Sequence, residues 1–196
     1  MAVAIINYNA GNIYSVEHAL HRLNVESVLT DDPAVIRQAD KVIFPGQGEA
    51  LRTMDYLRKH KMDTLIKSLK QPVLGICIGM QLMCRHSEEG DTDCLGIFNA
   101  EVKRFLPLKH EEKVPHMGWN NLTEVKAPLF TKDEENAYAY FVHSFYVPLC
   151  TDTVATTDYI QPFSAALYRD NFYATQFHPE KSGKVGEHIL SNFLKL

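Results

Sequence analysis

The chain has 196 residues, of which 45% are apolar and 22% are charged. At roughly 150 residues per domain, this length predicts a single domain over residues 1–196 with a sizeable core. The apolar fraction, together with only 10 glycines and 9 prolines, excludes disordered, collagen-like and low-complexity proteins. The net charge of −4 leaves no basic excess to neutralise phosphates, so we expect no nucleic-acid partner.

The amino-terminal residues 1–6 lack the basic region of a secretory signal, and no cleavage-site pattern follows them. The longest nearly apolar stretch, residues 73–84, is far shorter than the roughly 20 residues that cross a bilayer. We therefore expect a cytoplasmic protein without a membrane partner. The cysteines show no Cys-x-x-Cys spacing, which argues against a zinc ribbon or a thioredoxin-like redox pair. They are Cys77, Cys84, Cys94 and Cys150.

In chain order, the first half alternates between short apolar runs and segments whose apolar residues recur at helical spacing. Strands are predicted at residues 1–8, 25–29, 41–44 and 72–76. Helices are predicted at 13–23, from Pro33, at 50–69 with a break near Lys61, and at 80–85. The Asp31-Asp32-Pro33 sequence is typical of a helix N-cap followed by proline in the first turn.

The second half has a different pattern. Short runs rich in aromatic and β-branched residues predict strands at 137–147, 153–157, 164–168 and 172–177, some of them antiparallel, before a last helix at 186–194. The alternation in the first half is typical of a parallel sheet covered on both faces. We therefore predict an α/β fold: a mostly parallel open sheet with helices on both faces and added antiparallel strands in the C-terminal half.

The strongest local signal for chemistry is Gly75-Ile76-Cys77-Ile78-Gly79, between a predicted strand and a predicted helix. Two glycines around a nucleophilic residue permit the sharp turn called a nucleophile elbow. This turn would hold the Cys77 sulfur at a helix N-terminus, where the helix dipole favours the thiolate. The pentapeptide also suits a buried structural cysteine, so by itself it leaves both interpretations open.

A base for such a nucleophile is available in His178-Pro179-Glu180, which follows the strand predicted at 172–177. In an extended segment residues two apart point the same way, so His178 and Glu180 share a side. The carboxylate could then hold one imidazole nitrogen while the other faces the sulfur, as in a catalytic triad. Alone, the tripeptide also suits a solvated turn, and the pairing with Cys77 favours catalysis.

A third motif, Pro45-Gly46-Gln47-Gly48, ends the strand predicted at 41–44. In an open parallel sheet ligands bind at this edge, and two glycines let backbone N–H groups turn toward a ligand, as an oxyanion hole requires. Leu51 stands where a dinucleotide-binding motif needs its third glycine, which excludes that interpretation. An ordinary strand-ending turn remains the alternative.

His18 and His21 lie three residues apart on the first predicted helix and could share a metal ion, but no third ligand accompanies them. We therefore expect an exposed helical face there. No other group has the spacing of metal ligands or of a cofactor motif, so we expect neither a metal nor a cofactor. Cys84 is expected to pack in the core.

Taken together, the motifs at 45–48, 75–81 and 178–180 resemble those of the class I, triad-type glutamine amidotransferases. Four segments, 9–12, 115–120, 141–144 and 178–182, further resemble the glutaminase subunits of imidazole glycerol phosphate synthase. The resemblance covers essentially the whole chain and implies the flavodoxin-like architecture of the class. By resemblance, Cys77 attacks the side-chain amide of L-glutamine to form a γ-glutamyl thioester, His178 moves the protons and Glu180 orients His178.

The resemblance also implies roles for residues around the triad. Gly46, Gln47 and Gly48 match the oxyanion strand; Gln81, Glu89, His143 and Ser144 match positions that hold the amino-acid end of glutamine. Gln47 stands where the family usually has a small apolar residue, which leaves the resting conformation of this strand open.

A partner is implied as well. The family's glutaminase docks on a (β/α)₈-barrel cyclase subunit, through which ammonia passes to a phosphoribulosyl nucleotide intermediate. The products are imidazole glycerol phosphate and an aminoimidazole carboxamide ribotide, in histidine biosynthesis. By resemblance, Asn12, Trp119 and Lys181 face this partner. A lone Trp between Gly and Asn also suits an interface anchor on chemical grounds, with a core aromatic as the alternative.

Three alternatives remain open: a class I amidotransferase that serves another acceptor enzyme, a non-catalytic scaffold on this fold, and a free-standing cysteine hydrolase. The segment 115–120 argues against the first, because it belongs to the docking side of the resembling family. The presence of all three triad residues argues against the second. Full activity of the isolated chain would indicate the third.

Overall fold

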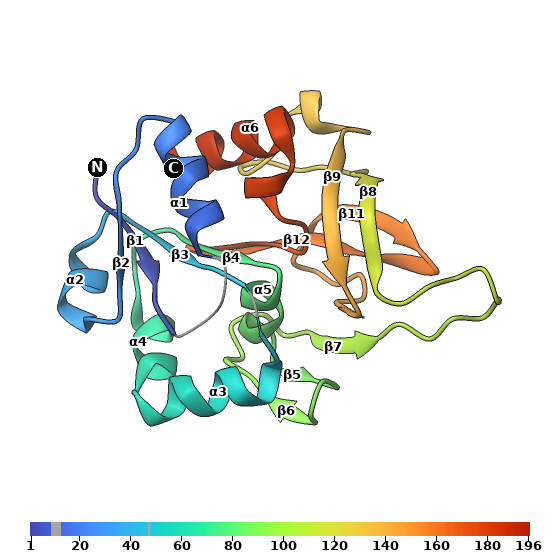
Figure 1. Cartoon of the computed structure of the whole chain (residues 1–196), viewed down its shortest axis with the longest axis horizontal. Helices are drawn as coiled ribbons and strands as arrows, with labels where there is room; N and C mark the ends of the chain where they lie inside the picture. Colours follow the sequence, from blue (N-terminus) through green and yellow to red (C-terminus); the bar gives the residue numbers. More distant parts are fainter. Residues whose placement is uncertain (9–12, 47) are drawn as a thin grey trace.

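The computed structural model of the chain describes residues 1–8, 13–46 and 48–196 (Figure 1). Asn12 and Gln47, which the sequence analysis assigns to a partner interface and to the oxyanion strand, lie outside the described residues. Within those ranges, no helix is long and apolar enough to cross a membrane.

A seven-stranded sheet forms the centre of the molecule, with the strand order β11-β12-β13-β4-β3-β1-β2. Its strands are β1 (Val3–Ile6), β2 (Ser27–Thr30), β3 (Lys41–Phe44), β4 (Val73–Ile76), β11 (Thr153–Tyr159), β12 (Gln161–Arg169) and β13 (Phe172–Thr175). β1 is parallel to β2 and β3, and β4 is parallel to β3 and β13. β12 and β11 extend the sheet in the antiparallel sense. The predicted fold class is confirmed.

Helices cover both faces of this sheet (Figure 1). One face carries α1 (Tyr14–Arg22) and α6 (Gly183–Leu194). The other carries α2 (Pro33–Gln38), α3 (Ala50–Lys59), α4 (Met62–Ser68) and α5 (Ile78–Met83). Because successive strand residues point to opposite faces, β1 contributes to both cores. Ala4 and Ile6 pack on the α3 side, and Val3 and Ile5 pack on the α1 side.

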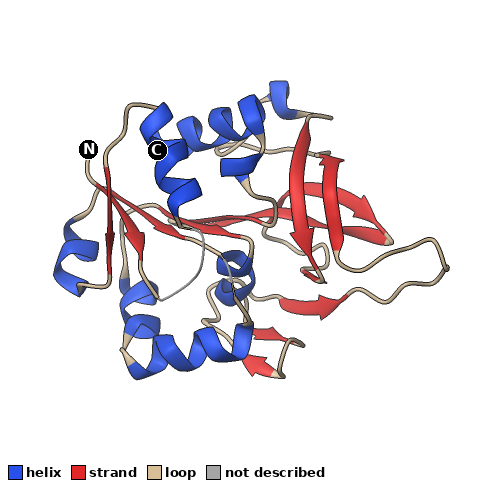
Figure 2. Ribbon diagram, in the orientation of Figure 1, coloured by secondary structure: helices blue, strands red, loops and turns tan. Residues whose placement is uncertain are grey.

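Two smaller sheets lie beside the central one (Figure 2). One contains β10 (Phe145–Tyr146), β7 (Glu101–Arg104), β5 (His86–Ser87) and β6 (Thr92–Asp93), and the other pairs β8 (His116–Asn121) with β9 (Tyr138–His143). The single strand region predicted over 137–147 is therefore divided at Ser144 between two sheets. The strands β5 to β8 were not predicted, because so few residues of mixed polarity carry little periodicity.

The helix boundaries follow local chemistry. Asp32 caps α2 by accepting a hydrogen bond from Ala34 N at 2.8 Å, with Pro33 in the first turn, as predicted. The break predicted near Lys61 is confirmed, because Lys61 has a φ of 56° and separates α3 from α4. The helix predicted over 80–85 is corrected: α5 starts at Ile78 and ends before the fully buried Cys84, whose backbone is extended.

Candidate active site

Cys77 occupies the turn between β4 and α5, and its backbone is strained. Its φ of 52° and ψ of −108° are uncommon for a residue with a side chain, and such a conformation costs about 1–3 kcal/mol. Two hydrogen bonds hold it: Cys77 N donates to Thr175 O at 2.7 Å, and Gln81 N donates to Cys77 O at 3.2 Å. The first continues the sheet and the second begins the helix, so the turn has the geometry of a nucleophile elbow.

The segment after β3 packs against this elbow, backbone to backbone. A Cβ added at Gly46 would lie 1.9 Å from Ile76 O and 2.6 Å from Ile78 N. On the other side, a Cβ added at Gly79 would lie 2.3 Å from Phe44 O. Glycine is therefore required at both positions by close approach. Gly48 has a φ of 131°, which also favours glycine.

His178 and Glu180 follow β13, the strand next to β4. His178 Nδ1 and Glu180 Oε1 are 2.7 Å apart, and the two side chains are only 4% and 5% exposed. The turn is anchored at Ser182, whose Oγ donates to His178 O at 2.7 Å and accepts from Tyr140 N at 2.9 Å. The predicted contact between His178 and Glu180 is confirmed, but the extended geometry predicted for it is wrong. Pro179–Lys181 forms a 3₁₀ turn that begins at His178 and brings the carboxylate to the ring.

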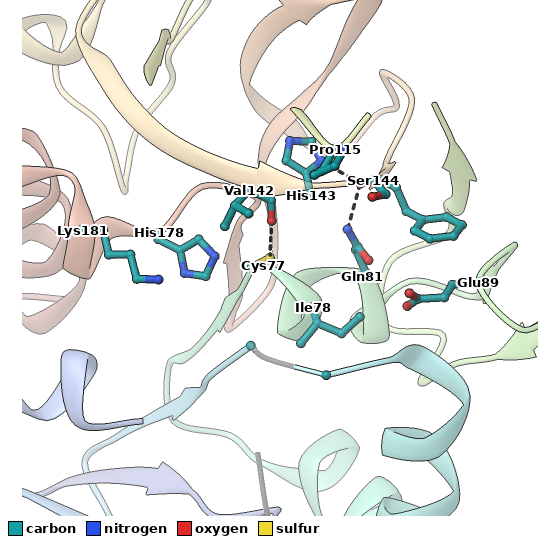
Figure 3. Close-up of a pocket in the computed structure, with 13 residues that line it drawn as sticks. Cys77, Ile78, Gln81, Glu89, Pro115, Val142, His143, Ser144, His178 and Lys181 are labelled. Atoms are coloured by element: carbon teal, nitrogen blue, oxygen red, sulfur yellow. Dashed lines mark hydrogen bonds between the residues drawn. The ribbon is translucent and has the colours of Figure 1, made fainter. Parts of the chain in front are cut away.

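The His178 ring faces the Cys77 sulfur (Figure 3). Burial opposes the charged form of the ring, but the attraction and hydrogen bond of the Cys77 thiolate, and then those of Glu180, outweigh it. They raise the pKa of His178 to about 10, so the ring holds its proton at neutral pH beside the Cys77 sulfur. As a thiol, Cys77 can instead donate to Val142 O at 3.9 Å.

A cavity of about 510 Å³ opens in front of this pair (Figure 3). The predicted site residues that line it are Gly46, Gly48, Cys77, Gln81, Glu89, His143, Ser144, His178 and Lys181. Residues to which the sequence analysis assigned no role also line it: Ile78, Pro115, Val142 and Phe145. Ile78, Val142 and Phe145 adjoin assigned residues in the sequence, and Pro115 begins the segment 115–120 of the family resemblance. Glu180 does not line the cavity and lies behind His178.

Gln81 and Glu89 are held by the protein itself. Gln81 Nε2 donates to Phe145 O at 2.9 Å and to Gln176 Oε1 at 3.0 Å. Glu89 Oε2 accepts from Ala50 N at 2.9 Å at the start of α3. Burial raises the pKa of the Glu89 carboxyl, the Ala50 hydrogen bond opposes this, and the charge of a neighbouring carboxylate adds to it. A half-buried carboxylate in a cavity wall suits a substrate ammonium group.

His143 contributes to the cavity wall, but both of its ring nitrogens have protein partners. Nδ1 lies 2.7 Å from Phe145 O, and Nε2 lies 3.0 Å from Nδ1 of His116. Burial, the largest influence, lowers the pKa of His116 to about 4 and that of His143 to about 3. Both rings are therefore neutral at physiological pH.

These lowered pKa values predict a pH effect on stability. Between pH 6.5 and about 4 the unfolded chain protonates both histidines and the folded chain does not, so stability falls as the pH falls. Each histidine contributes a slope of about 1.4 kcal/mol per pH unit. We expect His116→Phe to make this slope shallower by about that amount in urea unfolding. Equal slopes for wild type and His116→Phe would contradict the prediction.

The β8–β9 outer face is the side of the hairpin on which the register puts Met117, Trp119, Asn121, Tyr138, Tyr140 and Val142. Trp119 is 56% exposed, so the alternative of a core aromatic is wrong. Its ring meets Tyr140 edge to face at 5.9 Å. Val142 is on the same face and lines the cavity, so the outer face reaches the candidate active site.

His18 and His21 are exposed on α1 and line a second, smaller cavity with Glu17 and Glu26. In the part of the chain that the structure describes, no group of three or more His, Cys, Asp or Glu residues is arranged to hold a metal ion. The four cysteines are free thiols.

Comparison with known proteins identifies the class. Residues 4–196 match the family described as Glutamine amidotransferase class-I, and the chain belongs to this family. The Imidazole glycerol phosphate synthase subunit HisH of Bacteroides thetaiotaomicron is 64% identical over 196 residues, which are 100% of both chains. Proteins of the same name from Yersinia pseudotuberculosis and Escherichia coli are 44% identical over 202 residues, again covering 100% of both chains. Within its class, the chain therefore belongs to the HisH family.

Solved structures share the fold at low sequence identity. The structure of a glutamine amidotransferase matches with a TM-score of 0.75 and 17% identity, over 98% of this chain and 97% of that chain. PurLQS from Thermotoga maritima matches with a TM-score of 0.70 and 16% identity, over 99% of this chain and 97% of that chain. These likenesses confirm the architecture.

Proposed function

We propose that this chain is the single-domain glutaminase subunit of an imidazole glycerol phosphate synthase, acting in histidine biosynthesis in the cytoplasm. The observation that carries the proposal is the triad itself: the strained Cys77 elbow faces the buried His178–Glu180 pair across a cavity. The full-length identity to the HisH proteins supports the particular pathway.

In the proposed reaction, Cys77 Sγ attacks the side-chain amide carbon of glutamine. The resulting oxyanion would accept hydrogen bonds from Ile78 N–H, in the first turn of α5, and from the glycine segment after β3. His178 gives its proton to the leaving nitrogen, so the C–N bond breaks and ammonia departs from the γ-glutamyl thioester. His178 then takes a proton from water, whose attack on the thioester releases glutamate and restores the thiolate.

The amino-acid end of glutamine would lie at the opposite end of the cavity from His178. The Glu89 carboxylate suits the substrate ammonium group, and the backbone at Ser144 suits the α-carboxylate. The ring of His143 is committed to protein partners, so we propose that it acts by holding the wall rather than by touching substrate.

A Glu180→Gln variant tests whether Glu180 orients His178 without taking part in bond making. We expect Glu180→Gln to lower glutaminase kcat by about 10²-fold, much less than the loss of the nucleophile, because the amide oxygen can still accept from His178 Nδ1. The charge that helps to raise the pKa of His178 is lost, so the pH range of activity should also shift downward. A steady-state pH profile measures both effects. A loss as large as that of Cys77→Ala would contradict an orienting role.

The β8–β9 outer face is the proposed docking site for a (β/α)₈-barrel cyclase subunit. Its exposed aromatic residues suit an interface core, and its continuity with the cavity suits ammonia transfer. Lys181 lies beside His178 in the cavity wall and is proposed to face the same partner.

Trp119 is the expected anchor of that interface. We expect Trp119→Ala to weaken cyclase binding by about 30-fold in a titration, because a truncated aromatic anchor typically costs about 2 kcal/mol or more, which corresponds to that factor. Val28→Ala is the control: Val28 is also exposed, at 43%, on β2 at the far edge of the central sheet. Equal affinity of wild type and Trp119→Ala for the cyclase would contradict docking on the β8–β9 outer face.

The experiment that tests the whole proposal measures glutamate release from glutamine by the purified chain. It is run with the chain alone, with the cyclase added, and with both the cyclase and its nucleotide substrate added. Activity that rises strongly only in the last two conditions supports the synthase assignment. Equal activity in all three would favour a free-standing hydrolase, and activity in none would favour a scaffold.

A further inference from the structure

Three side chains beneath the β8–β9 outer face form a chain of hydrogen bonds. Asn120 Nδ2 lies 3.3 Å from His116 Nε2, and His116 Nδ1 lies 3.0 Å from His143 Nε2. His143 Nδ1 then lies 2.7 Å from Phe145 O. All three side chains come from the inner face of the hairpin, opposite Trp119 in the alternation of β8.

Which atom donates in each of these hydrogen bonds follows from the last acceptor, the carbonyl oxygen of Phe145. A carbonyl oxygen only accepts, so His143 Nδ1 carries a hydrogen and, in a neutral ring, Nε2 accepts. His116 must then donate from Nδ1 and accept at Nε2, where the Asn120 amide is the donor. The lowered pKa values of both rings agree with one hydrogen per ring.

Burial keeps water from replacing these bonds. His116 is 3% exposed and His143 is 6% exposed. The ring of His116 stacks on Tyr159 at 4.0 Å between centroids, and His143 packs against Phe163 at 5.2 Å. A buried acceptor that loses its donor in such aromatic surroundings stays unsatisfied, which is unfavourable.

The chain of bonds ends at a carbonyl that shapes the cavity. Phe145 O also accepts from Gln81 Nε2, so both of its lone pairs are used. Gln81 donates further to Gln176, whose Nε2 lies 3.7 Å from Cys77 Sγ. The Ser144–Phe145 wall is thus tied to the hairpin on one side and to the nucleophile on the other.

We propose that His116 is a positioning residue for glutamine recognition, with Asn120 holding its far nitrogen. Through His143 it fixes the Ser144–Phe145 backbone, against which the amino-acid end of glutamine lies. This inference rests on the proposed glutaminase function. It assigns the inner face of the β8–β9 hairpin to substrate binding, in addition to the proposed docking of the cyclase on its outer face.

The test compares two variants of His116 in the glutaminase assay, under whichever of the three conditions above gives the highest wild-type activity. His116→Phe keeps the stacked ring and removes the donor, and we expect it to raise KM for glutamine about tenfold with kcat within about twofold. His116→Asn keeps an amide N–H where Nδ1 was, and we expect it to hold KM within about threefold of wild type. His18→Phe is the surface control. Unchanged KM in His116→Phe, or equal loss in both variants, would overturn the proposal.

Labelling of Cys77 separates recognition from a damaged nucleophile. We expect the rate of alkylation by iodoacetamide to be the same in His116→Phe as in wild type, and labelling by the glutamine analogue 6-diazo-5-oxo-L-norleucine to be slower by about tenfold. Equal slowing with both reagents would indicate a structural defect and overturn the positioning role. A wild-type chain that reacts with neither glutamine nor the analogue would instead overturn the proposed function.

The tautomers give a readout that needs no turnover and no variant. In ¹⁵N-histidine spectra of the wild-type chain we expect His116 and His143 both to carry hydrogen on Nδ1 and to stay neutral down to about pH 5. A hydrogen on Nε2 of either ring would break the chain of bonds and with it the proposal.

Discussion

Cys77→Ala is expected to lower glutamate release from glutamine by at least about 10⁴-fold while leaving the chain folded. The substitution removes the only atom of the elbow that can form the thioester. Alanine retains the Cβ, so the strained backbone at φ 52° and its two hydrogen bonds are unchanged. The proposed complex with the cyclase should still make product from added ammonia, because in the proposed synthase the acceptor chemistry lies in the partner.

The measurement pairs a glutamate-release assay with the ammonia-dependent reaction of the complex and a thermal unfolding curve. Cys150→Ala is the matched control, since Cys150 is a half-buried free thiol outside the cavity, and its activity should stay within about twofold of wild type. Loss of both the glutamine and the ammonia reactions in Cys77→Ala would mean that the residue supports the interface or the fold.

Gly46→Ala is expected to have the largest effect on stability, a loss of at least about 3 kcal/mol of unfolding free energy together with nearly all activity. The added methyl would lie 1.9 Å from Ile76 O, and neither that carbonyl nor Ile78 N can move without distorting the elbow. The strand β3 and the turn at Cys77 would separate, which displaces the proposed oxyanion donors from Cys77.

Gly96→Ala separates this clash from the ordinary effect of losing a glycine. Gly96 has a φ of 70°, and none of the described residues comes within 4 Å of an added Cβ, so only the left-handed backbone penalty of about 1–2 kcal/mol applies. Urea unfolding and glutaminase assays on both variants measure the difference. A Gly46→Ala protein as stable and active as Gly96→Ala would contradict the close approach of the two segments.

The candidate triad could be predicted from sequence because its members stand next to recognisable strand ends. Cys77 follows β4, and His178 follows β13. Gly46, which packs against the Cys77 turn, follows β3. These three strands are parallel neighbours, so their carboxyl ends lie at one edge of the sheet. Motifs of this kind are local: glycines permit the turn at Cys77, and one 3₁₀ turn brings Glu180 to His178, two residues away.

Other site features had no local signal. Gln81 meets Gln176 across 95 residues of sequence, and His116 meets His143 across 27. Each residue alone resembles an ordinary buried or surface polar group. The division of 137–147 at Ser144 was equally hidden, because β9 and β10 pair with different partners and pairing partners are not encoded in periodicity.

The sequence by itself determined the fold class, the elbow, the His–Glu pair and the glycines, because these depend on hydrophobic period and backbone freedom within a few residues. Only the tertiary structure decided which residues form the cavity wall that faces Cys77. It also decided that both ring nitrogens of His143 bond to protein partners and that Trp119 lies on an exposed face. These outcomes depend on long-range strand pairing and on the satisfaction of buried polar groups, both of which require the folded chain.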